Sequence, residues 1–281
     1  MCGVDDRRVE AAAAKARLLA VTMVYEAASG HIGGSLSCID IVAALYYKTM
    51  NIRPESPDWA DRDRFVMSKG HCSPALYPIL ALRGFFTVER LKEFRSIDGH
   101  LSGHVEMRHV PGVDMSTGSL GQGVSTAVGM ALAGKLKGSG YRVYTLLGDG
   151  EIAEGQVWEA MLSAAKYKLD NLCVIVDVNG LQIDGRTADV MPTEPLDKKF
   201  EAFGCNVIEA DGHDLNALES AFERARTVKD KPCVILAKTV KGKGVSFMEG
   251  KAGWHGKAPN EQEFTQAKQE LTAALAKIEV K

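Results

Sequence analysis

The chain has 281 residues, of which 46% are hydrophobic, and its formal net charge is −2 at pH 7. This length and composition suit one large α/β domain, and the nearly balanced charge argues against a nucleic-acid partner. No apolar run reaches the roughly 18 residues that a membrane-spanning helix needs, and the mixed-charge N-terminus does not resemble a secretory signal. Six cysteines without CxxC or CxxH spacing indicate reduced thiols and a cytoplasmic location.

Apolar periodicity predicts helices and strands that alternate along the chain. Helices are expected over residues 7–28, 37–48, from 74 onward, after 123, and over 154–168, 195–203, 214–228 and 261–278. Strands are expected over residues 64–67, 141–147, 172–178, 205–210 and 233–239. This order is typical of an α/β fold with a doubly wound, mostly parallel sheet flanked by helices, here as a single domain over 1–281. Small residues over 127–134 suit either tight packing on the sheet or a subunit interface.

The central stretch, residues 141–185, is predicted to form a strand, a glycine turn, a helix, a second strand and a polar turn. Asp149 follows the first strand and Asn179 follows the second. A parallel βαβ unit places the C-terminal ends of both strands at the same sheet edge, so these side chains should meet. A carboxylate, an amide oxygen and a backbone carbonyl from the following turn are ligands that Mg²⁺ accepts together with substrate phosphates. The unit therefore predicts a metal-bridged diphosphate.

The same turn also fits a rival motif. Gly148, Gly150 and Ala153 match the loose dinucleotide pattern G-x-G-x-x-A between a strand and a helix. A carboxylate at Asp149 would repel a bare pyrophosphate unless a divalent cation lay between them. Asp149 therefore favours the metal–diphosphate interpretation over a dinucleotide.

Four histidines lie beside or close to glycines in predicted loops: His31, His71, His104 and His255. Such residues donate hydrogen bonds to phosphate and transfer protons near neutral pH, which suits an anionic, hydroxylated substrate. The remaining three, His100, His109 and His213, are expected to be structural or solvated, with His213 in a capping turn. Cys72, next to His71, is an alternative nucleophile on weak grounds.

Seven short segments in order identify a resemblance: SGHIGGSLS, SKGHCSPALY, SGHVE, STGSLGQGVSTAVGMA, GDGEIAEGQVWEA, NGLQIDG and WHG. Together they resemble the N-terminal, thiamine diphosphate-binding region of transketolase over nearly the whole chain. The resemblance implies the thiamine diphosphate-binding fold, with thiamine diphosphate and Mg²⁺ or Ca²⁺ as cofactors. The sequence STGSL departs from the commoner Gly-Pro-Leu turn of the family only at its middle residue.

The resemblance also implies roles for individual residues. Asp149, the Asn179 side chain and the Leu181 carbonyl would hold the metal. Contacts to the diphosphate would come from Gly150, His71 and His255, and contacts to the two rings of the cofactor from Gly118, Ser119 and Leu120. His31, His104 and His255 would face the donor ketose and aid proton transfer. Glu154 would lie at a subunit interface that links two cofactor sites.

Full-length transketolases are more than twice as long as this chain and carry pyrimidine-binding and C-terminal domains as well. We therefore expect the N-terminal subunit of a split transketolase, paired with a C-terminal subunit in an α₂β₂ heterotetramer. The implied reaction moves a two-carbon ketol unit from a ketose phosphate to an aldose phosphate, as in the pentose phosphate pathway. One alternative is a related ketol transferase subunit that acts on a modified sugar. Alternatives of another class are a Rossmann-type dinucleotide-binding protein and a non-catalytic subunit.

Overall fold

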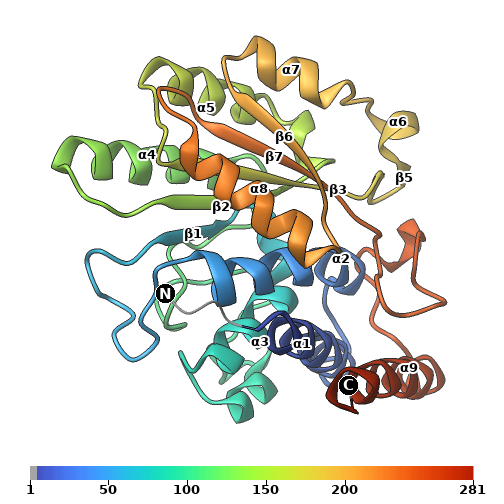
Figure 1. Ribbon diagram of the computed structural model, residues 1–281. Helices are drawn as coiled ribbons and strands as arrows, with labels where there is room; N and C mark the ends of the chain where they lie inside the picture. The colour runs from blue at the N-terminus through green and yellow to red at the C-terminus, as the bar shows by residue number, and fades with distance from the viewer. Residues whose placement is uncertain (1–4, 281) are drawn as a thin grey trace.

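The computed structural model describes residues 5–280, and a five-stranded sheet lies at the centre of this part of the chain (Figure 1). Its strands all pair in parallel, in the order β1-β2-β3-β7-β6. They are β1 (Arg64–Met67), β2 (Val143–Gly148), β3 (Leu172–Val178), β6 (Asn206–Asp211) and β7 (Cys233–Lys238). The predicted α/β fold with a parallel sheet is therefore confirmed.

Helices cover both faces of the sheet. They are α1 (Asp6–Glu26), α2 (Ile32–Ala44), α3 (Ser73–Arg83), α4 (Gln122–Lys137), α5 (Gly155–Lys166), α6 (Thr187–Val190), α7 (Leu196–Ala202), α8 (Leu215–Thr227) and α9 (Glu261–Val280). Within residues 5–280, none of these is long and apolar enough to cross a membrane.

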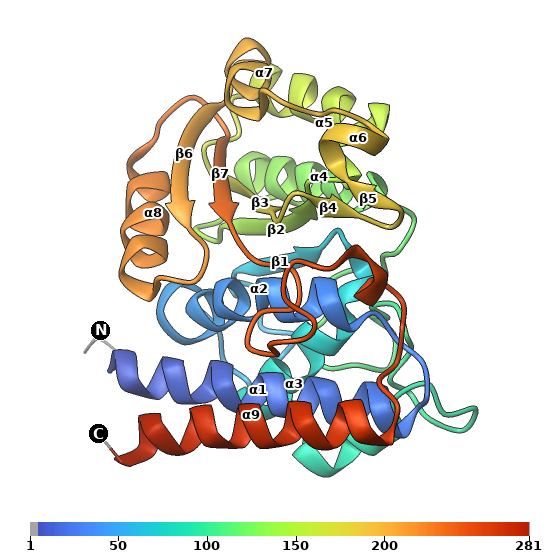
Figure 2. The ribbon, with the colours of Figure 1, turned by 90° about the vertical axis from the view of Figure 1, so that its right-hand side faces the viewer.

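Each face of the sheet has its own apolar core. On one face, Val124, Val157 and Phe200 bring α4, α5 and α7 against the strands. The other face carries α1, α2, α3 and α8, and α9 packs outside α1 (Figure 2). There, α1 and α9 run antiparallel, and Arg7 Nε donates to the carbonyl of Ile278 at 3.1 Å. The sheet is therefore buried on both faces, which explains the continuous apolar character of its inner strands.

The structure corrects the predicted start of the second helix. The glycine-rich segment before residue 37 is not a loop: α2 begins at Ile32, and His31 occupies the N-cap position. A Cβ atom on Gly33 would lie 2.8 Å from the carbonyl oxygen of Trp254, so glycine permits this close approach. Tertiary packing thus overrides the poor helix propensity of glycine.

The segments that follow β2 and β3 also differ from expectation. A 3₁₀ turn (Glu151–Ala153) follows β2, and α5 begins only at Gly155, so Glu154 is the N-cap residue rather than part of the first turn. After β3, the predicted polar turn is an antiparallel hairpin of β4 (Leu181–Gln182) and β5 (Gly185–Arg186).

The carboxyl ends of the strands meet at one edge, as the βαβ prediction requires. Gly148 is the register partner of Asp177, and the amide of Asp149 donates to the Asp177 carbonyl at 3.2 Å. The amide of Thr239, just after β7, donates to the Val178 carbonyl at 3.0 Å. The residues that follow β1, β2, β3 and β7 therefore converge.

Candidate functional site

A cavity of about 390 Å³ opens at this edge of the sheet. All the predicted site residues line it except Ser119: they are His31, His71, His104, Gly118, Leu120, Asp149, Gly150, Glu154, Asn179, Leu181 and His255. Ser119 lines a neighbouring hollow with Ser116 and Gln122 instead.

Asp149 is 3% exposed at the inner end of this cavity. Its two carboxylate oxygens accept backbone hydrogen bonds from Gly150, at 2.9 Å, and from Gly180, at 2.5 Å. Burial, together with the neighbouring Asp177 carboxylate, raises the pKa of Asp149 to about 6. A buried carboxylate with a raised pKa is a group that a bound cation would stabilise in its charged form.

Asn179 and Leu181 bring the other predicted metal ligands to the same place. The Asn179 side-chain oxygen accepts from the Leu181 amide at 3.1 Å, which fixes the turn between them. The Lys241 ammonium lies 3.4 Å from the Leu181 carbonyl and 3.1 Å from His255 Nδ1. A positive charge therefore already faces one of the proposed metal ligands.

A buried ion pair behind Asp149 was not predicted from the sequence. Asp177 is fully buried and accepts from the Lys69 ammonium, from Ser37 Oγ at 2.6 Å and from Thr239 Oγ1. Lys69 also donates to the Gly34 carbonyl at 3.1 Å, which ties the start of α2 to this edge of the sheet. The available signal was one acidic residue within the otherwise apolar strand LCVIVDV.

Glu151 is a second buried carboxylate that the sequence analysis missed. Its oxygens accept from Ser68 Oγ at 2.5 Å, the Gly121 amide at 2.9 Å and the Gly148 amide at 3.1 Å. Burial raises its pKa, although these hydrogen bonds oppose the rise. Side-chain carboxylates thus already bind the turn amides that a dinucleotide pyrophosphate would need, which argues against the rival motif.

The four predicted histidines do gather at the cavity. The ring of His31 lies 5.3 Å from that of His71, 5.5 Å from that of His104 and 5.4 Å from that of His255. Burial and His71 lower the pKa of His31 to about 4, and burial and Lys241 lower that of His255 to about 3. Burial also lowers the pKa of His104. At neutral pH these three rings are therefore uncharged, and each offers one donor and one acceptor.

Two side-chain nitrogens at the cavity are buried without a hydrogen-bond partner in the described part of the chain: His31 Nδ1 and Gln182 Nε2. Gln182 comes from the hairpin after β3 and packs beside Gly150. A Cβ atom added at Gly150 would lie 2.9 Å from the Gln182 Cβ. Buried polar atoms usually have partners, so these two are suited to contact a ligand.

The remaining histidines lie elsewhere, and Cys72 is inaccessible. His100 and His109 stack on each other at 4.8 Å outside the cavity, and His109 also contacts Glu106. His213 is mostly buried and hydrogen-bonded on both ring nitrogens, so it is structural rather than solvated. Cys72 is fully buried and does not line the cavity, which argues against the nucleophile alternative.

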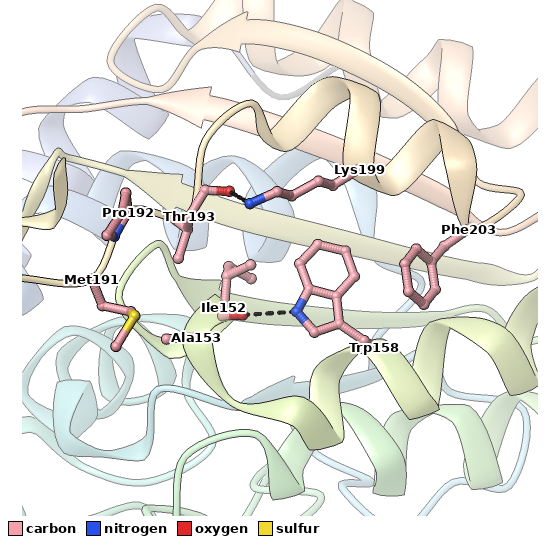
Figure 3. A pocket seen from close by; sticks show the side chains of 8 residues that line it. All are labelled: Ile152, Ala153, Trp158, Met191, Pro192, Thr193, Lys199 and Phe203. Carbon is pink, nitrogen blue, oxygen red and sulfur yellow. Dashed lines mark hydrogen bonds between the residues drawn. The ribbon is translucent and has the colours of Figure 1, made fainter.

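A second cavity, also of about 390 Å³, lies on the neighbouring face (Figure 3). It shares only Ala153 with the first, and its other lining residues are Ile152, Trp158, Met191, Pro192, Thr193, Lys199 and Phe203. Lys199 donates to the Thr193 carbonyl at 2.6 Å, and Trp158 Nε1 donates to the Ile152 carbonyl at 3.0 Å. Its lining includes no carboxylate that could hold a divalent ion, so it does not suit a metal-bridged diphosphate.

The described geometry defines an α/β domain with a polar, ligand-binding sheet edge. The family described as "Transketolase, thiamine diphosphate binding domain" matches residues 8–280. The chain is 46% identical over 255 residues to the 6-deoxy-6-sulfo-D-fructose transketolase subunit SqwG of a Clostridium species, covering 91% of this chain and 93% of that protein. It is 44% identical over 268 residues to one of the subunits of the apulose-4-phosphate transketolase of Phocaeicola vulgatus, covering 94% of each.

A solved transketolase from Campylobacter jejuni superposes with a TM-score of 0.89 at 34% identity. The alignment covers 98% of this chain but 46% of that one, so this chain spans about half the length of the solved enzyme. The chain therefore belongs to the transketolase family, as a thiamine diphosphate-binding domain.

Proposed function

We propose that this chain is the thiamine diphosphate-binding subunit of a two-chain transketolase, a transferase that moves a two-carbon ketol unit between sugars. The observation that carries the proposal is the convergence of Asp149, Asn179 and the Leu181 carbonyl in one cavity with four histidines. Two relatives covered over more than nine-tenths of their length are themselves transketolase subunits, which supports the two-chain arrangement. The amides of Gly148 and Gly150 already donate to the carboxylates of Glu151 and Asp149, which weighs against a dinucleotide-binding protein.

The proposed metal ligands are hard oxygen donors, and they suit Mg²⁺ or Ca²⁺. The buried carboxylate of Asp149 supports the fit, because a bound cation would favour its charged form. The Lys241 ammonium contacts the Leu181 carbonyl in the ligand-free chain, and burial and Lys69 lower its pKa, so it would leave that carbonyl when the metal binds. Asn179, which lines the same cavity as Asp149, would complete the set through its side-chain oxygen, which accepts from the Leu181 amide in the ligand-free chain.

Thiamine diphosphate, when bound, supplies the stabilisation of the carbanion on which ketol transfer depends. In our proposal Gly150, His71 and His255 contact its diphosphate, with Lys241 as an additional cation that the sequence analysis missed. Gly118 and Leu120 line the part of the cavity nearer His104 and would contact the cofactor rings. Ser119 is the third predicted ring contact, although it lines the neighbouring hollow rather than this cavity.

We assign proton transfer at the donor sugar to His31, His104 and His255. Their lowered pKa values keep the rings neutral at pH 7, so each can accept a proton from a hydroxyl and donate one to a carbonyl oxygen. His31 is well placed for this, because its buried Nδ1 has no partner within residues 5–280.

The partner chain in this proposal is a C-terminal transketolase subunit with the pyrimidine-binding domain, in an α₂β₂ heterotetramer. Residues 1–281 would then form a single diphosphate-binding domain. Glu154 is exposed at the cavity and is the N-cap residue of α5, which supports a role at the subunit contact. We propose a cytoplasmic location, supported by five buried free thiols among the described residues; Cys2 lies outside them.

For the substrate, a modified sugar is better supported than the common ketose and aldose phosphates of the pentose phosphate pathway. The names of two relatives specify 6-deoxy-6-sulfo-D-fructose and apulose 4-phosphate. The alternative from the sequence analysis is therefore the better-supported proposal.

The test is co-purification with a candidate C-terminal subunit, followed by turnover assays with ketose phosphates, a sulfo-sugar and a branched sugar phosphate. We expect turnover that requires both chains, thiamine diphosphate and a divalent ion. Turnover by this chain alone would overturn the two-chain proposal, and cofactor binding in excess chelator would overturn the metal site. A preference for ordinary pentose phosphates would overturn the substrate proposal.

A further inference from the structure

The segment 239–242 carries Lys241 from the end of β7 to the cavity. Its first residue, Thr239, donates through Oγ1 to Asp177. Its last, Gly242, donates through its amide to the Gly33 carbonyl at 2.9 Å. Between these two anchors, the Lys241 carbonyl accepts from the Gly250 amide at 2.9 Å, and the Val240 amide is a further point at which the backbone leading into Lys241 is held.

That backbone is held by a histidine from a distant loop. The amide of Val240 donates to His213 Nε2 at 2.9 Å, and His213 Nδ1 lies 2.7 Å from Asp40 Oδ2. Because Nε2 accepts a hydrogen bond, the ring proton is on Nδ1, which donates to Asp40. The two contacts therefore select one neutral tautomer of His213.

Asp40 is itself fixed by a buried arginine. Arg17 donates to both Asp40 oxygens, from Nη1 at 2.9 Å and from Nη2 at 2.5 Å. The side chains of Arg17, Asp40 and His213 are 10%, 12% and 14% exposed. Although burial acts in the opposite direction, Arg17 and His213 lower the pKa of Asp40 to about 2. The carboxylate thus stays charged at any working pH and keeps its hold on the imidazole.

The turn around His213 does not need the imidazole. Asp211 accepts from the His213 amide at 2.8 Å, and Asp214 caps α8 by accepting from the amides of Asn216 and Ala217. These bonds involve only the backbone at position 213. The side chain is therefore free for another purpose, and substitutions there leave the capping turn intact.

We propose that His213, oriented by Asp40 and Arg17, is a positioning residue that holds the Val240 backbone so that the Lys241 ammonium faces the diphosphate end of the cavity. The inference rests on the proposed function for the identity of the ligand. The Arg17–Asp40–His213 chain starts in α1, passes through α2 and reaches the loop before α8, so three separate elements set the position of one cavity residue.

Two substitutions separate the two ring contacts. His213→Asn keeps a nitrogen near the position of Nδ1, which can donate to Asp40, but it cannot reach Val240. His213→Gln places an amide oxygen near the position of Nε2 and can still accept from the Val240 amide. A purely structural role through Asp40 predicts that asparagine is the better replacement, whereas the positioning role predicts glutamine.

The experiment uses the full chain and two readouts. Hydrogen exchange of the ligand-free chain reports on segment 239–242, with β3 as the internal control, and calorimetry measures thiamine diphosphate binding in excess Mg²⁺. We expect His213→Asn to raise exchange at Val240 and to weaken cofactor binding, each about tenfold, the effect of losing one hydrogen bond. We expect His213→Gln to stay within about threefold of the parent chain, since it retains that hydrogen bond.

Equal behaviour of the two variants, or unchanged exchange at Val240 in His213→Asn, would overturn the inference. If the parent chain bound no cofactor, the calorimetry would be repeated on the two-chain complex, and absence of binding there would overturn the proposed function. The exchange measurement would still decide whether His213 positions the segment. Melting temperatures of both variants identify any loss of fold. If His213→Asn does not fold, His213→Gln decides: retained protection of the Val240 amide supports the inference, and lost protection overturns it.

Discussion

The substitution Asp149→Asn should have opposite effects on stability and on cofactor binding. Burial raises the pKa of Asp149 from 3.8 to about 6 in the ligand-free chain, which corresponds to about 3 kcal/mol. Between these pH values the folded chain holds a proton that the unfolded chain has lost. The parent chain therefore loses stability as the pH rises from about 4 to about 6.

Asparagine does not titrate, so the variant escapes this loss. Its amide nitrogen must face the amide of either Gly150 or Gly180, a mismatch that costs about 1–3 kcal/mol at every pH. The stability of the variant relative to the parent should therefore improve by about 2 kcal/mol between pH 4 and pH 7. Metal-dependent binding of thiamine diphosphate should be lost over the same range.

Urea unfolding in the presence of a chelator, at pH steps from 4 to 7.5, measures the first effect. A thermal-shift titration with Mg²⁺ and thiamine diphosphate measures the second, since ligand at a hundred times its dissociation constant adds about 2.7 kcal/mol to the parent chain. Parallel stability curves for parent and variant would refute the argument from burial. A normal ligand shift in the variant would remove Asp149 from the metal site.

Three further substitutions test other parts of the site. In the two-chain complex, His104→Ala should lower turnover at least tenfold, with a smaller effect on cofactor affinity. The control His109→Ala, at an exposed histidine, should change neither quantity. A larger effect of His104→Ala on affinity than on turnover would mean that His104 contacts the cofactor rather than the substrate. Lys241→Met should weaken cofactor binding about tenfold or more in calorimetry, because the buried ammonium faces the cavity. The control is Lys243→Met, at a partly exposed lysine, which should leave binding unchanged; equal effects of the two substitutions would mean that Lys241 has no specific role. Cys72→Ala should retain turnover, because the thiol is buried away from the cavity; complete loss with an intact fold would restore the nucleophile alternative.

Much of the fold could be predicted because its strands have a clear physical signature. The short strand predicted over 64–67 and the apolar run over 172–178 match β1 and β3 without error, since strands buried on both faces are mostly apolar. Parallel topology then placed Asp149 and Asn179 together without any knowledge of side-chain geometry.

The start of α2 could not be predicted from local preference. Gly33 and Gly34 disfavour a helix, and only the approach of the Trp254 carbonyl, more than 200 residues away in the chain, accounts for a glycine at the first of these positions. The same limit applies to Asp177 and Lys69. Each is a charged residue whose partner comes from the end of another strand, so the sequence around either one does not predict the ion pair.

His213 shows a third kind of limit. Its neighbours Asp211 and Asp214 have the pattern of a capping turn, and that part of the prediction is correct. The pattern describes the backbone at position 213 and contains no information about the direction of the imidazole. Only the packing of the loop against α2 brings the ring to Asp40.

The position of the Lys241 ammonium has a thermodynamic consequence. On the proposed assignment, a metal ion that arrives alone competes with the Lys241 ammonium for the Leu181 carbonyl and leaves that ammonium with His255 Nδ1 as its remaining contact. A metal ion that arrives with diphosphate supplies new anionic oxygens to the displaced lysine. Each ion should therefore tighten the binding of the other, and this coupling is reciprocal. Lys241 would thus act as an exchangeable counter-ion that biases the site toward the complete metal–diphosphate pair.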